Sequence, residues 1–177
     1  MNYHAYVDSP IGRLRLYGDE RAVTALVLDP QAAPIDAPAR GGTNPAVDPG
    51  IEDPRAGVLP VAARQLAEYF AGARHTFALP LAARGSPFQE RVWRALLGIA
   101  YGRTQSYGEI ARRIGQPAAA RAVGMANNRN PLPIFVPCHR VIGADGTLVG
   151  YGGGLERKRW LLTLESTAGA AAANSRQ

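Results

Sequence analysis

The sequence predicts a mixed α/β (α+β) fold, in which a strand-rich first part is followed by a helical second part. Residues 3–28 show the apolar–polar alternation of short strands separated by turns. Two capping-box patterns, at 86–89 and 106–109, each open a helical period in the second part. With 177 residues, 46% of them hydrophobic, the chain can bury one ordinary core or two small ones.

Three strands are expected in the first part, at residues 3–7, 13–17 and 22–28. The intervening residues 8–12 contain Asp, Ser, Pro and Gly, which favour reversals of the chain, so the strands should form a meander. Residues 29–57 are rich in Pro, Ala, Gly and Asp without a sustained period, which indicates a long surface loop.

One helix and one further strand should complete the first part. Apolar residues recur at helical spacing within 61–71, and Gly72 follows as a stop signal. Residues 76–79 are interpreted as a short fourth strand.

The second part should consist of helices. Ser86 is a suitable N-cap, and Pro87 and Gln89 after it fit the start of a helix. The capping box at 106–109 opens a shorter helix, and an alanine-rich helix should follow at 118–126.

Two short helices joined by a Gly-containing turn in a basic segment form a helix-turn-helix, a motif that docks on DNA. A closing helix is expected at 155–164.

These elements divide the chain into a domain at 1–84, a second domain at 85–166 and a tail at 167–177, for which we expect disorder. The excess positive charge belongs to the second domain, because 85–165 contains eleven Arg or Lys against five Asp or Glu, and the rest is neutral. Nineteen of the twenty basic residues are Arg, which suits phosphate contact and base stacking. On charge alone, a solvated basic surface and a nucleic-acid surface fit equally well.

The helix at 118–126 has small residues at six positions and one long charged side chain, Arg121. Small residues let a backbone approach another surface closely. That surface is either the protein's own core or, given Arg121 in a basic region, a DNA groove.

The chain has a single cysteine, Cys138, so it can form neither an internal disulfide nor a multi-thiolate metal site. Cys138 is either buried packing or a working thiol. His139 and Arg140 follow it, and a base or a positive charge would lower the pKa of the thiol. Neighbours in an extended segment point to opposite sides, however, so a Cys-His pair alone is a weak indication.

Two further features lie near the end of the chain. The glycine-rich segment 150–154 can take positive φ and approach a ligand closely. Glu165 lies at the end of the closing helix, where the helix dipole disfavours a carboxylate, so it is either a surface residue or has a specific partner.

No apolar run approaches the eighteen or so residues that a membrane span needs. The first residues also lack the basic-then-apolar pattern of a secretory signal. We therefore expect a cytoplasmic protein that does not bind membranes.

An ordered series of motifs runs from about Pro87 to Glu165. They are Phe88-Gln89, Val92-Trp93, Ser106-Tyr107-Gly108-Glu109, Ala120-Arg121-Ala122-Val123-Gly124, Asn130-Pro131, Pro137-Cys138-His139-Arg140-Val141, Gly150-Tyr151 and Gly153-Gly154. In these motifs the sequence resembles the methylated-DNA–protein-cysteine (O6-alkylguanine) alkyltransferases. The amino-terminal part is similar to that family in outline, as a ribonuclease-H-like layer of strands and a helix.

The resemblance implies a role for each matching residue. Cys138 is the acceptor thiol, His139 the general base that takes its proton through a water, and Glu165 the carboxylate that orients the imidazole. Tyr107 donates a hydrogen bond to the guanine as its oxygen leaves.

The resemblance also implies that the second helix of the helix-turn-helix lies in the minor groove, with Arg121 filling the gap left by an extruded base. The remaining expected positions are Ala120, Ala122 and Gly124 at the DNA, and Asn130, Val141, Tyr151, Gly152 and Gly153 in and around the substrate pocket.

The activity that follows is DNA repair by direct reversal. Each molecule once transfers a methyl or larger alkyl group from O6-alkylguanine, and from O4-alkylthymine, in duplex DNA to Cys138, and the thioether product has no route to turnover. We expect a monomer without a cofactor. We also expect no metal, because the amino-terminal part contains only His4 and His75 and no cysteine.

Two other functions remain as alternatives. A non-enzymatic sensor would bind alkylguanine and recruit repair factors, but proteins of that class lack the reactive cysteine. A cysteine hydrolase with a Cys138–His139 pair would release many product molecules from each protein.

Overall fold

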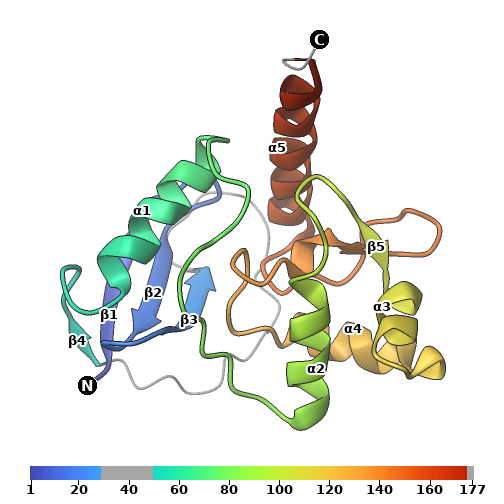
Figure 1. Cartoon of the computed structure of the whole chain (residues 1–177), viewed down its shortest axis with the longest axis horizontal. Helices are drawn as coiled ribbons and strands as arrows, with labels where there is room; N and C mark the ends of the chain where they lie inside the picture. The colour runs from blue at the N-terminus through green and yellow to red at the C-terminus, as the bar shows by residue number, and fades with distance from the viewer. Residues whose placement is uncertain (29–49, 175–177) are drawn as a thin grey trace.

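The structure, a computed structural model, describes residues 1–28 and 50–174, with the backbone alone for 168–174. Figure 1 shows one sheet and one helix in one half of the molecule, and the remaining helices together with a second, short sheet in the other. Most of the loop expected at 29–57 therefore lies outside the described residues. No helix in the described part of the chain is long and apolar enough to cross a membrane.

The first half is built on a four-stranded sheet with the order β3-β2-β1-β4. Its strands are β1 (Tyr3–Val7), β2 (Leu14–Gly18), β3 (Val23–Leu28) and β4 (Ile51–Glu52). The first three form the predicted antiparallel meander, and β4 pairs with β1 in parallel. Because β4 has only two residues and leaves no periodic pattern, it was not foreseen within the segment expected to be a loop.

One face of this sheet is covered by α1 (Leu59–Phe70), close to the predicted bounds and followed by Gly72 with a φ of 73°. The strand predicted at 76–79 is wrong. The amide of Gln65 donates from Nε2 to the carbonyl of Ala78 and accepts from its N–H, at 3.0 and 2.8 Å. A side chain thus satisfies the backbone groups that a neighbouring strand would have paired.

The second half contains the predicted helix-turn-helix. Its elements are α2 (Pro87–Leu96), β5 (Gln105–Ser106), α3 (Tyr107–Arg113), η1 (Pro117–Ala119), α4 (Ala120–Asn128), η2 (Cys138–Arg140), β6 (Val141–Ile142) and α5 (Leu155–Asn174). Both capping boxes are present, at Ser86 with Gln89 and at Ser106 with Glu109. Helices α2, α3 and α4 pack on one another, and Trp93 Nε1 donates to the carbonyl of Ala126 at 2.8 Å.

The closing helix is longer than predicted, because α5 continues to Asn174 rather than ending at 164. The expected disordered tail at 167–177 is therefore wrong as far as Asn174, and residues 175–177 lie outside the described part. Five of the six residues at 168–173 are alanine, the strongest helix former, which accounts for the extension.

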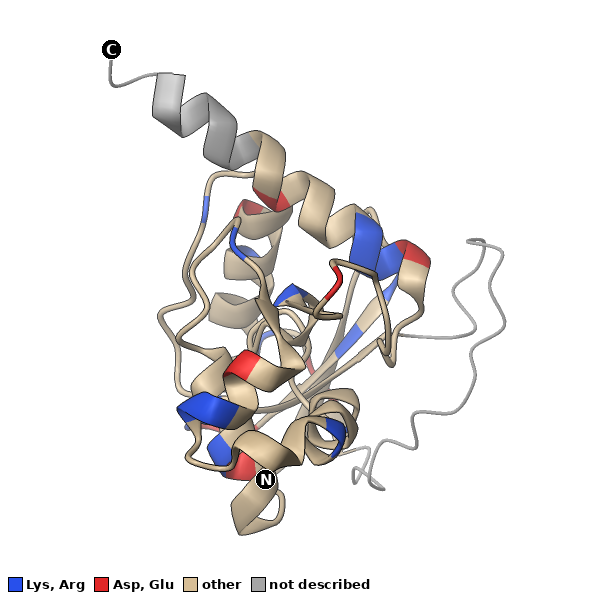
Figure 2. Ribbon diagram, turned by 90° about the vertical axis from the view of Figure 1, so that its right-hand side faces the viewer, with Lys and Arg blue, Asp and Glu red and all other residues tan. Residues whose placement is uncertain are grey.

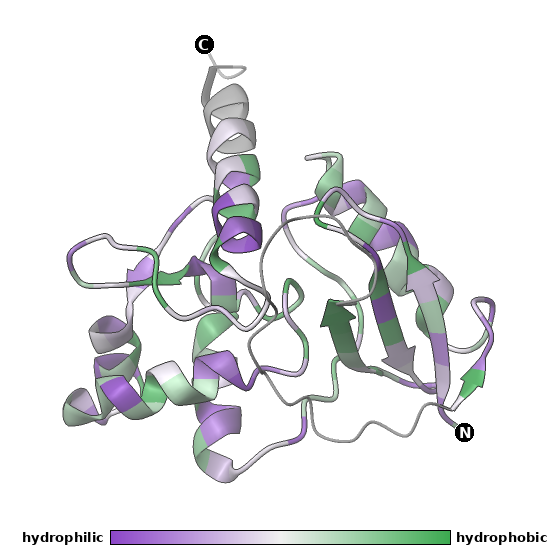
Figure 3. Cartoon of the chain, turned by 180° about the vertical axis from the view of Figure 1, so that it is seen from behind, coloured by the Kyte–Doolittle hydropathy of each residue, from purple (hydrophilic) through white to green (hydrophobic). Residues whose placement is uncertain are grey.

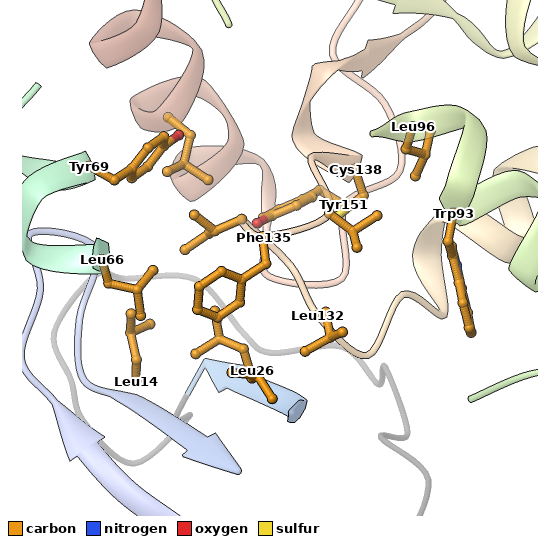
Figure 4. Close-up of a cluster of buried hydrophobic side chains, with 14 of the residues drawn as sticks. Leu14, Leu26, Leu66, Tyr69, Trp93, Leu96, Leu132, Phe135, Cys138 and Tyr151 are labelled. Carbon is orange, nitrogen blue, oxygen red and sulfur yellow. The ribbon is translucent and has the colours of Figure 1, made fainter. Parts of the chain in front are cut away.

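A single hydrophobic cluster joins the two halves. Figure 4 shows it passing from Leu14 and Leu66 in the first half, through Phe135, to Trp93 and Leu96 in the second. Strand β3, the most uniformly hydrophobic of the strands in Figure 3, lies on the side of the sheet nearest the second half. The shared core fixes β3 and α1 relative to the segment that carries Cys138.

The cap of α3 provides a test of how the helix-turn-helix is held. Ser106 Oγ accepts from the N–H of Glu109, and the Glu109 carboxylate accepts from the N–H of Ser106 at 2.6 Å. Ser106→Ala removes this cap, and we expect the free energy of unfolding in urea to fall by about 1 kcal/mol. Ser166→Ala, at an exposed helical position, is the matched control and should change it by less than about 0.5 kcal/mol. Equal losses in the two variants would contradict the capping role.

Candidate active site

Cys138 lies at the wall of a cavity of about 370 Å³ between the two halves. Its side chain is 3% exposed, and the cavity is lined by both polar and apolar groups. The lining residues are Leu26, Val27 and Leu28 of β3, Met125, Asn127, Asn128, Arg129 and Asn130 at the end of α4, Pro133, Cys138, and Tyr151, Gly152 and Gly153. The thiol is therefore buried, but it borders a hollow of the size of a small substrate, as a working thiol requires.

Two hydrogen bonds of Asn130 span the turn before Cys138. Asn130 Nδ2 donates to the carbonyl of Val136 at 2.8 Å, and its Oδ1 accepts from the N–H of Leu132 at 3.0 Å. Within this turn Ile134 has a φ of 74°, a conformation that costs energy for a β-branched residue. The two hydrogen bonds of Asn130 hold the turn closed across this strained residue.

Glu165 is fully buried and accepts hydrogen bonds from four residues. Its donors are His139 Nε2 at 2.9 Å, Arg140 Nε and Nη2 both at 2.8 Å, Tyr69 Oη at 2.7 Å and the N–H of Gly102 at 3.1 Å. The interpretation of Glu165 as a surface residue is wrong, and so is its placement at a helix end, since α5 continues for nine residues beyond it. The expectation that it has a specific partner is confirmed.

These hydrogen bonds and the burial of the site determine the protonation states of Glu165 and His139. Burial by itself would raise the pKa of Glu165, but the hydrogen bonds and charges of His139 and Arg140 lower it to about 2. Burial lowers the pKa of His139, and the carboxylate of Glu165 opposes this effect. Glu165 is thus ionised and His139 neutral near pH 7, with Nδ1 of the imidazole left without a hydrogen-bond partner among the described residues. A neutral imidazole with a free ring nitrogen can accept a proton.

The thiol of Cys138 is protonated at rest, because burial raises its pKa to about 11. The side chain of Asn130 and the charge of Lys158 act in the opposite direction. The idea that Arg140 lowers the pKa of the thiol is wrong, because its guanidinium is committed to Glu165 and to the carbonyl of Ile99. The thiol must therefore lose its proton to a base when it reacts.

Lys158 is the one functional candidate that composition could have revealed, because it is the single lysine beside nineteen arginines. It is fully buried on α5, and Nζ donates to the carbonyls of Val141 and Val149 at 2.5 and 2.7 Å. Burial lowers the pKa of Lys158 to about 8, so it is charged near neutral pH. It therefore closes the base of the loop between Val141 and Val149 and places a cation near the thiol.

Tyr107, at the start of α3, donates from its hydroxyl to the carbonyls of Val149 and Gly150 at 3.0 and 3.3 Å. Burial raises its pKa to about 12, so it remains a donor at physiological pH. A β-carbon at Gly124 of α4 would lie 3.7 Å from the Tyr107 ring. A methyl group at position 124 would therefore be in ordinary van der Waals contact with Tyr107, and the Tyr107 ring does not require a glycine there.

The small residues of α4 do not share one environment. Arg121, Ala122 and Met125 are exposed, whereas Ala120 and Gly124 are half-buried. Figure 2 shows basic positions distributed over the helical half, in keeping with the surplus of arginine there. On the exposed face of α4, Arg121 is therefore a long charged side chain next to the small side chain of Ala122.

Within the glycine-rich segment 150–154, the buried Tyr151 together with Gly152 and Gly153 forms another wall of the cavity. Positive φ occurs at Gly150 and Gly154, at 57° and 89°, but not at Gly152 or Gly153. A β-carbon at Gly153 would lie 2.2 Å from Leu28 Cδ1, so a larger residue there would displace the Leu28 side chain of β3. Gly153 thus lies in close contact with the first half rather than in a positive-φ turn.

Sequence reasoning missed three further contributions: Tyr69 of α1, Asn127, whose Nδ2 donates to the carbonyl of Cys138 at 3.2 Å, and the residues of β3 in the cavity wall. Tyr69 and β3 act over long sequence separations, and Asn127 acts across 11 positions of irregular chain, so local patterns report none of them. Among the described residues no group of three His, Cys, Asp or Glu is placed to hold a metal ion.

Comparison with known proteins agrees with the two halves. Residues 2–83 match the family model "6-O-methylguanine DNA methyltransferase, ribonuclease-like domain", and residues 87–167 match the model "6-O-methylguanine DNA methyltransferase, DNA binding domain". A methylated-DNA–protein-cysteine methyltransferase of Mycolicibacterium paratuberculosis is 54% identical over 90% of this chain and 89% of its own length.

Solved structures give the same result. The crystal structure of the O6-methylguanine methyltransferase of Mycobacterium tuberculosis is 50% identical, with a TM-score of 0.77 over 95% of this chain and 94% of that one. A structure of the M. tuberculosis protein in complex with DNA has the same TM-score at 48% identity, over 94% of both chains.

Lys158 offers a test of what sets the reactivity of the thiol. Lys158→Met removes the cation, so the pKa of Cys138 should rise and its alkylation by iodoacetamide at pH 7 should slow about tenfold for each unit of rise. Because the pKa of Lys158 is about 8, the difference from the wild type should shrink above that pH, where the wild-type lysine also becomes neutral.

Arg159→Met, the exposed neighbour on α5, is the matched control and should react as the wild type does. Circular dichroism must show that both variants are folded. The role of Lys158 would be refuted by folded variants that react at equal rates at pH 7.

Proposed function

Because this chain belongs to the family of 6-O-methylguanine DNA methyltransferases, we propose that Cys138 is the residue that accepts the alkyl group. The chain repairs DNA by direct reversal, transferring an alkyl group from alkylated DNA to a cysteine of its own. Cys138 is the only cysteine of the sequence. The observation that carries the proposal is its position at the wall of the cavity, beside the buried His139–Glu165 pair.

In the proposed reaction Cys138 Sγ attacks the alkyl carbon of O6-alkylguanine. The carbon–oxygen bond breaks, its electrons remain on the guanine oxygen, and a sulfur–carbon bond forms. The thiol proton passes through a water to Nδ1 of His139, which has no other partner among the described residues. Glu165 stabilises the imidazolium through Nε2. The product is a thioether without a leaving group, so each molecule acts once.

Tyr107 provides a hydrogen bond to the guanine as the negative charge develops on it. Its hydroxyl is neutral, because burial raises its pKa. The hydroxyl is held by hydrogen bonds to the carbonyls of Val149 and Gly150. Transfer of this hydrogen bond from the two carbonyls to the base requires only a rotation of the phenol. The pocket proposed to receive the base is bounded by Asn130 and the segment 151–153. Val141, also expected there, does not line this cavity, and its carbonyl accepts from Lys158 Nζ.

DNA binding is assigned to the helix-turn-helix, with α4 in the minor groove. Arg121 is exposed on that helix and would occupy the space in the stack from which the damaged nucleotide has rotated. The rotation costs a few kcal/mol, which stacking of Arg121 and contacts to phosphates offset. Ala120 and Ala122 next to it allow the helix backbone to approach the groove.

The protein is proposed to act as a monomer on duplex DNA containing O6-alkylguanine, in the cytoplasm. One chain carries the acceptor, the base, the pocket and the DNA-binding helices, so no second copy is needed to complete the site. A pure lesion sensor is disfavoured because Cys138 borders the pocket. A hydrolase is disfavoured because a thioether is stable to water.

The central test is to mix the protein with a duplex containing O6-methylguanine and to weigh the intact protein. We expect a gain of one methyl group per chain, mapped to Cys138, with repair stopping at one lesion per molecule. Cys138→Ala should show no gain while retaining most of its DNA affinity, because the residue contributes no charge or exposed surface.

Other outcomes have definite meanings. Binding without any gain of mass in the wild type would favour the sensor, and many products per protein would favour the hydrolase. Loss of DNA binding in Cys138→Ala would indicate a structural cysteine.

Arg121→Ala tests the proposed finger. Repair of a methylated duplex should slow roughly a hundredfold if the variant loses about 2–3 kcal/mol of stabilisation of the rotated base. Reaction with free O6-benzylguanine, which needs no rotation, should be nearly unchanged. Arg64→Ala, an exposed arginine of α1, controls for the loss of one positive charge. Equal slowing of the duplex and free-base reactions by Arg121→Ala would exclude the finger role.

A further inference from the structure

Tyr69 brings a hydroxyl from the first half of the molecule into the centre of the second. It lies near the end of α1, is fully buried, and donates from Oη to Glu165 Oε1 at 2.7 Å. The same oxygen lies 3.5 Å from Nε2 of His139. A residue of the strand-and-helix half therefore contacts the carboxylate that orients the proposed base, across 96 positions of sequence.

The phenol ring is fixed by packing. Phe77 and Tyr101 lie with ring centroids 5.4 and 6.1 Å from that of Tyr69, and Phe70 lies at 5.5 Å. Figure 4 shows Tyr69 at the edge of the core cluster, near α5. Since the ring cannot move without displacing these neighbours, the direction of the hydroxyl is set by the docking of α1 on the second half.

Tyr69 and His139 compete for the same oxygen. Oε1 of Glu165 accepts from Tyr69, from His139 and from Arg140 Nη2, while Oε2 accepts from Arg140 Nε and from Gly102. Each additional donor spreads the negative charge of the carboxylate and weakens its attraction for a proton on the imidazole. The hydrogen bond from Tyr69 therefore lowers the pKa of His139. Without it, the Glu165 carboxylate still has its other donors.

We propose that Tyr69 is a positioning residue for the transfer reaction, through which the first half of the molecule sets how strongly Glu165 holds His139. The inference rests on the proposed function, in which His139 is the base. In this proposal the first half does more than pack against the second, because Tyr69 of α1 donates one hydrogen bond to the Glu165 carboxylate.

The experiment is Tyr69→Phe, which keeps the ring and removes only the hydroxyl. Single-turnover rates of methyl transfer are measured from pH 5 to 9 at saturating protein, with a duplex containing O6-methylguanine. In the wild type the rate should fall on the acid side as His139 takes a proton. Without the hydroxyl, Oε1 attracts the imidazolium more strongly, the pKa of His139 rises, and the acid limb should move up by about half a unit to one unit.

The remaining charged and titratable groups around His139 are unchanged in this variant. They are Arg140 on η2, Lys158 on α5, Cys138 and Tyr101. Arg140 and Gly102 still hold the carboxylate, so the rate on the plateau should stay within about threefold of the wild type.

Tyr101→Phe is the matched control. Its ring packs on Tyr69, but its hydroxyl has no hydrogen-bond partner among the described residues. This variant also loses one buried phenol oxygen from the same cluster, and its acid limb should coincide with that of the wild type.

Three results would overturn the inference: an acid limb for Tyr69→Phe that coincides with that of the wild type, an equal shift in Tyr101→Phe, or a lower plateau with no shift of the limb. The last would show a purely structural role. In each case the wild type still transfers the methyl group, so the proposed function stands. A wild type that transfers nothing would instead refute the proposed function and this inference with it.

Discussion

The buried carboxylate of Glu165 is the interaction on which the rest of the structure depends. An isolated charge at a fully buried position would be too costly to keep, and breaking a buried pair costs about 3–5 kcal/mol. Here the guanidinium of Arg140 neutralises it with two hydrogen bonds, and Gly102, His139 and Tyr69 complete its coordination. These donors come from three separate segments, while Glu165 itself belongs to α5. One side chain thus ties α1, the turn after α2, the Cys138 segment and the closing helix together.

This arrangement explains why the acceptor can be both reactive and protected. Burial raises the pKa of Cys138 to about 11, so the resting protein presents a thiol rather than a thiolate to solvent. Such a thiol reacts slowly with adventitious electrophiles. Burial also keeps His139 neutral, and because Arg140 balances the charge of Glu165, the group of His139, Arg140 and Glu165 carries no net charge before reaction. In the proposed mechanism, charge separation therefore arises only when a substrate carbon is within reach of the sulfur, which suits a protein that can react once.

The sequence was informative wherever the physics is local. Alternation over five or six residues identified the meander, and the two capping boxes located α2 and α3 because a cap and its partner are three residues apart. It failed where a side chain replaced a backbone partner, as Gln65 did for the strand expected at 76–79. It predicted the start of α5 but not its extension to Asn174. It also did not place Lys158 on the inward face of this helix, where it lies with Leu161 and Glu165, because a polar residue on a buried face contradicts the apolar pattern of a helix. The resemblance to the alkyltransferases identified Glu165 as a site residue. The hydrogen bonds that Tyr69 and Arg140 donate to it could not be found from the sequence, because they join distant segments.

The same long-range contacts connect the DNA-facing surface with the chemistry. Helix α4 exposes Arg121 on one side, and at its end Asn127 donates to the carbonyl of Cys138. Gly124 on the same helix lies next to the ring of Tyr107. A rigid helix transmits a displacement at one end to the other, and in the proposed complex a nucleotide replaced by Arg121 would emerge beside the cavity that α4 itself helps to line. Arg121 and Asn127, which donates to the carbonyl of Cys138, lie on the same helix of nine residues. In the proposed complex the placement of the base therefore depends on the geometry of α4 and on this hydrogen bond to the Cys138 segment.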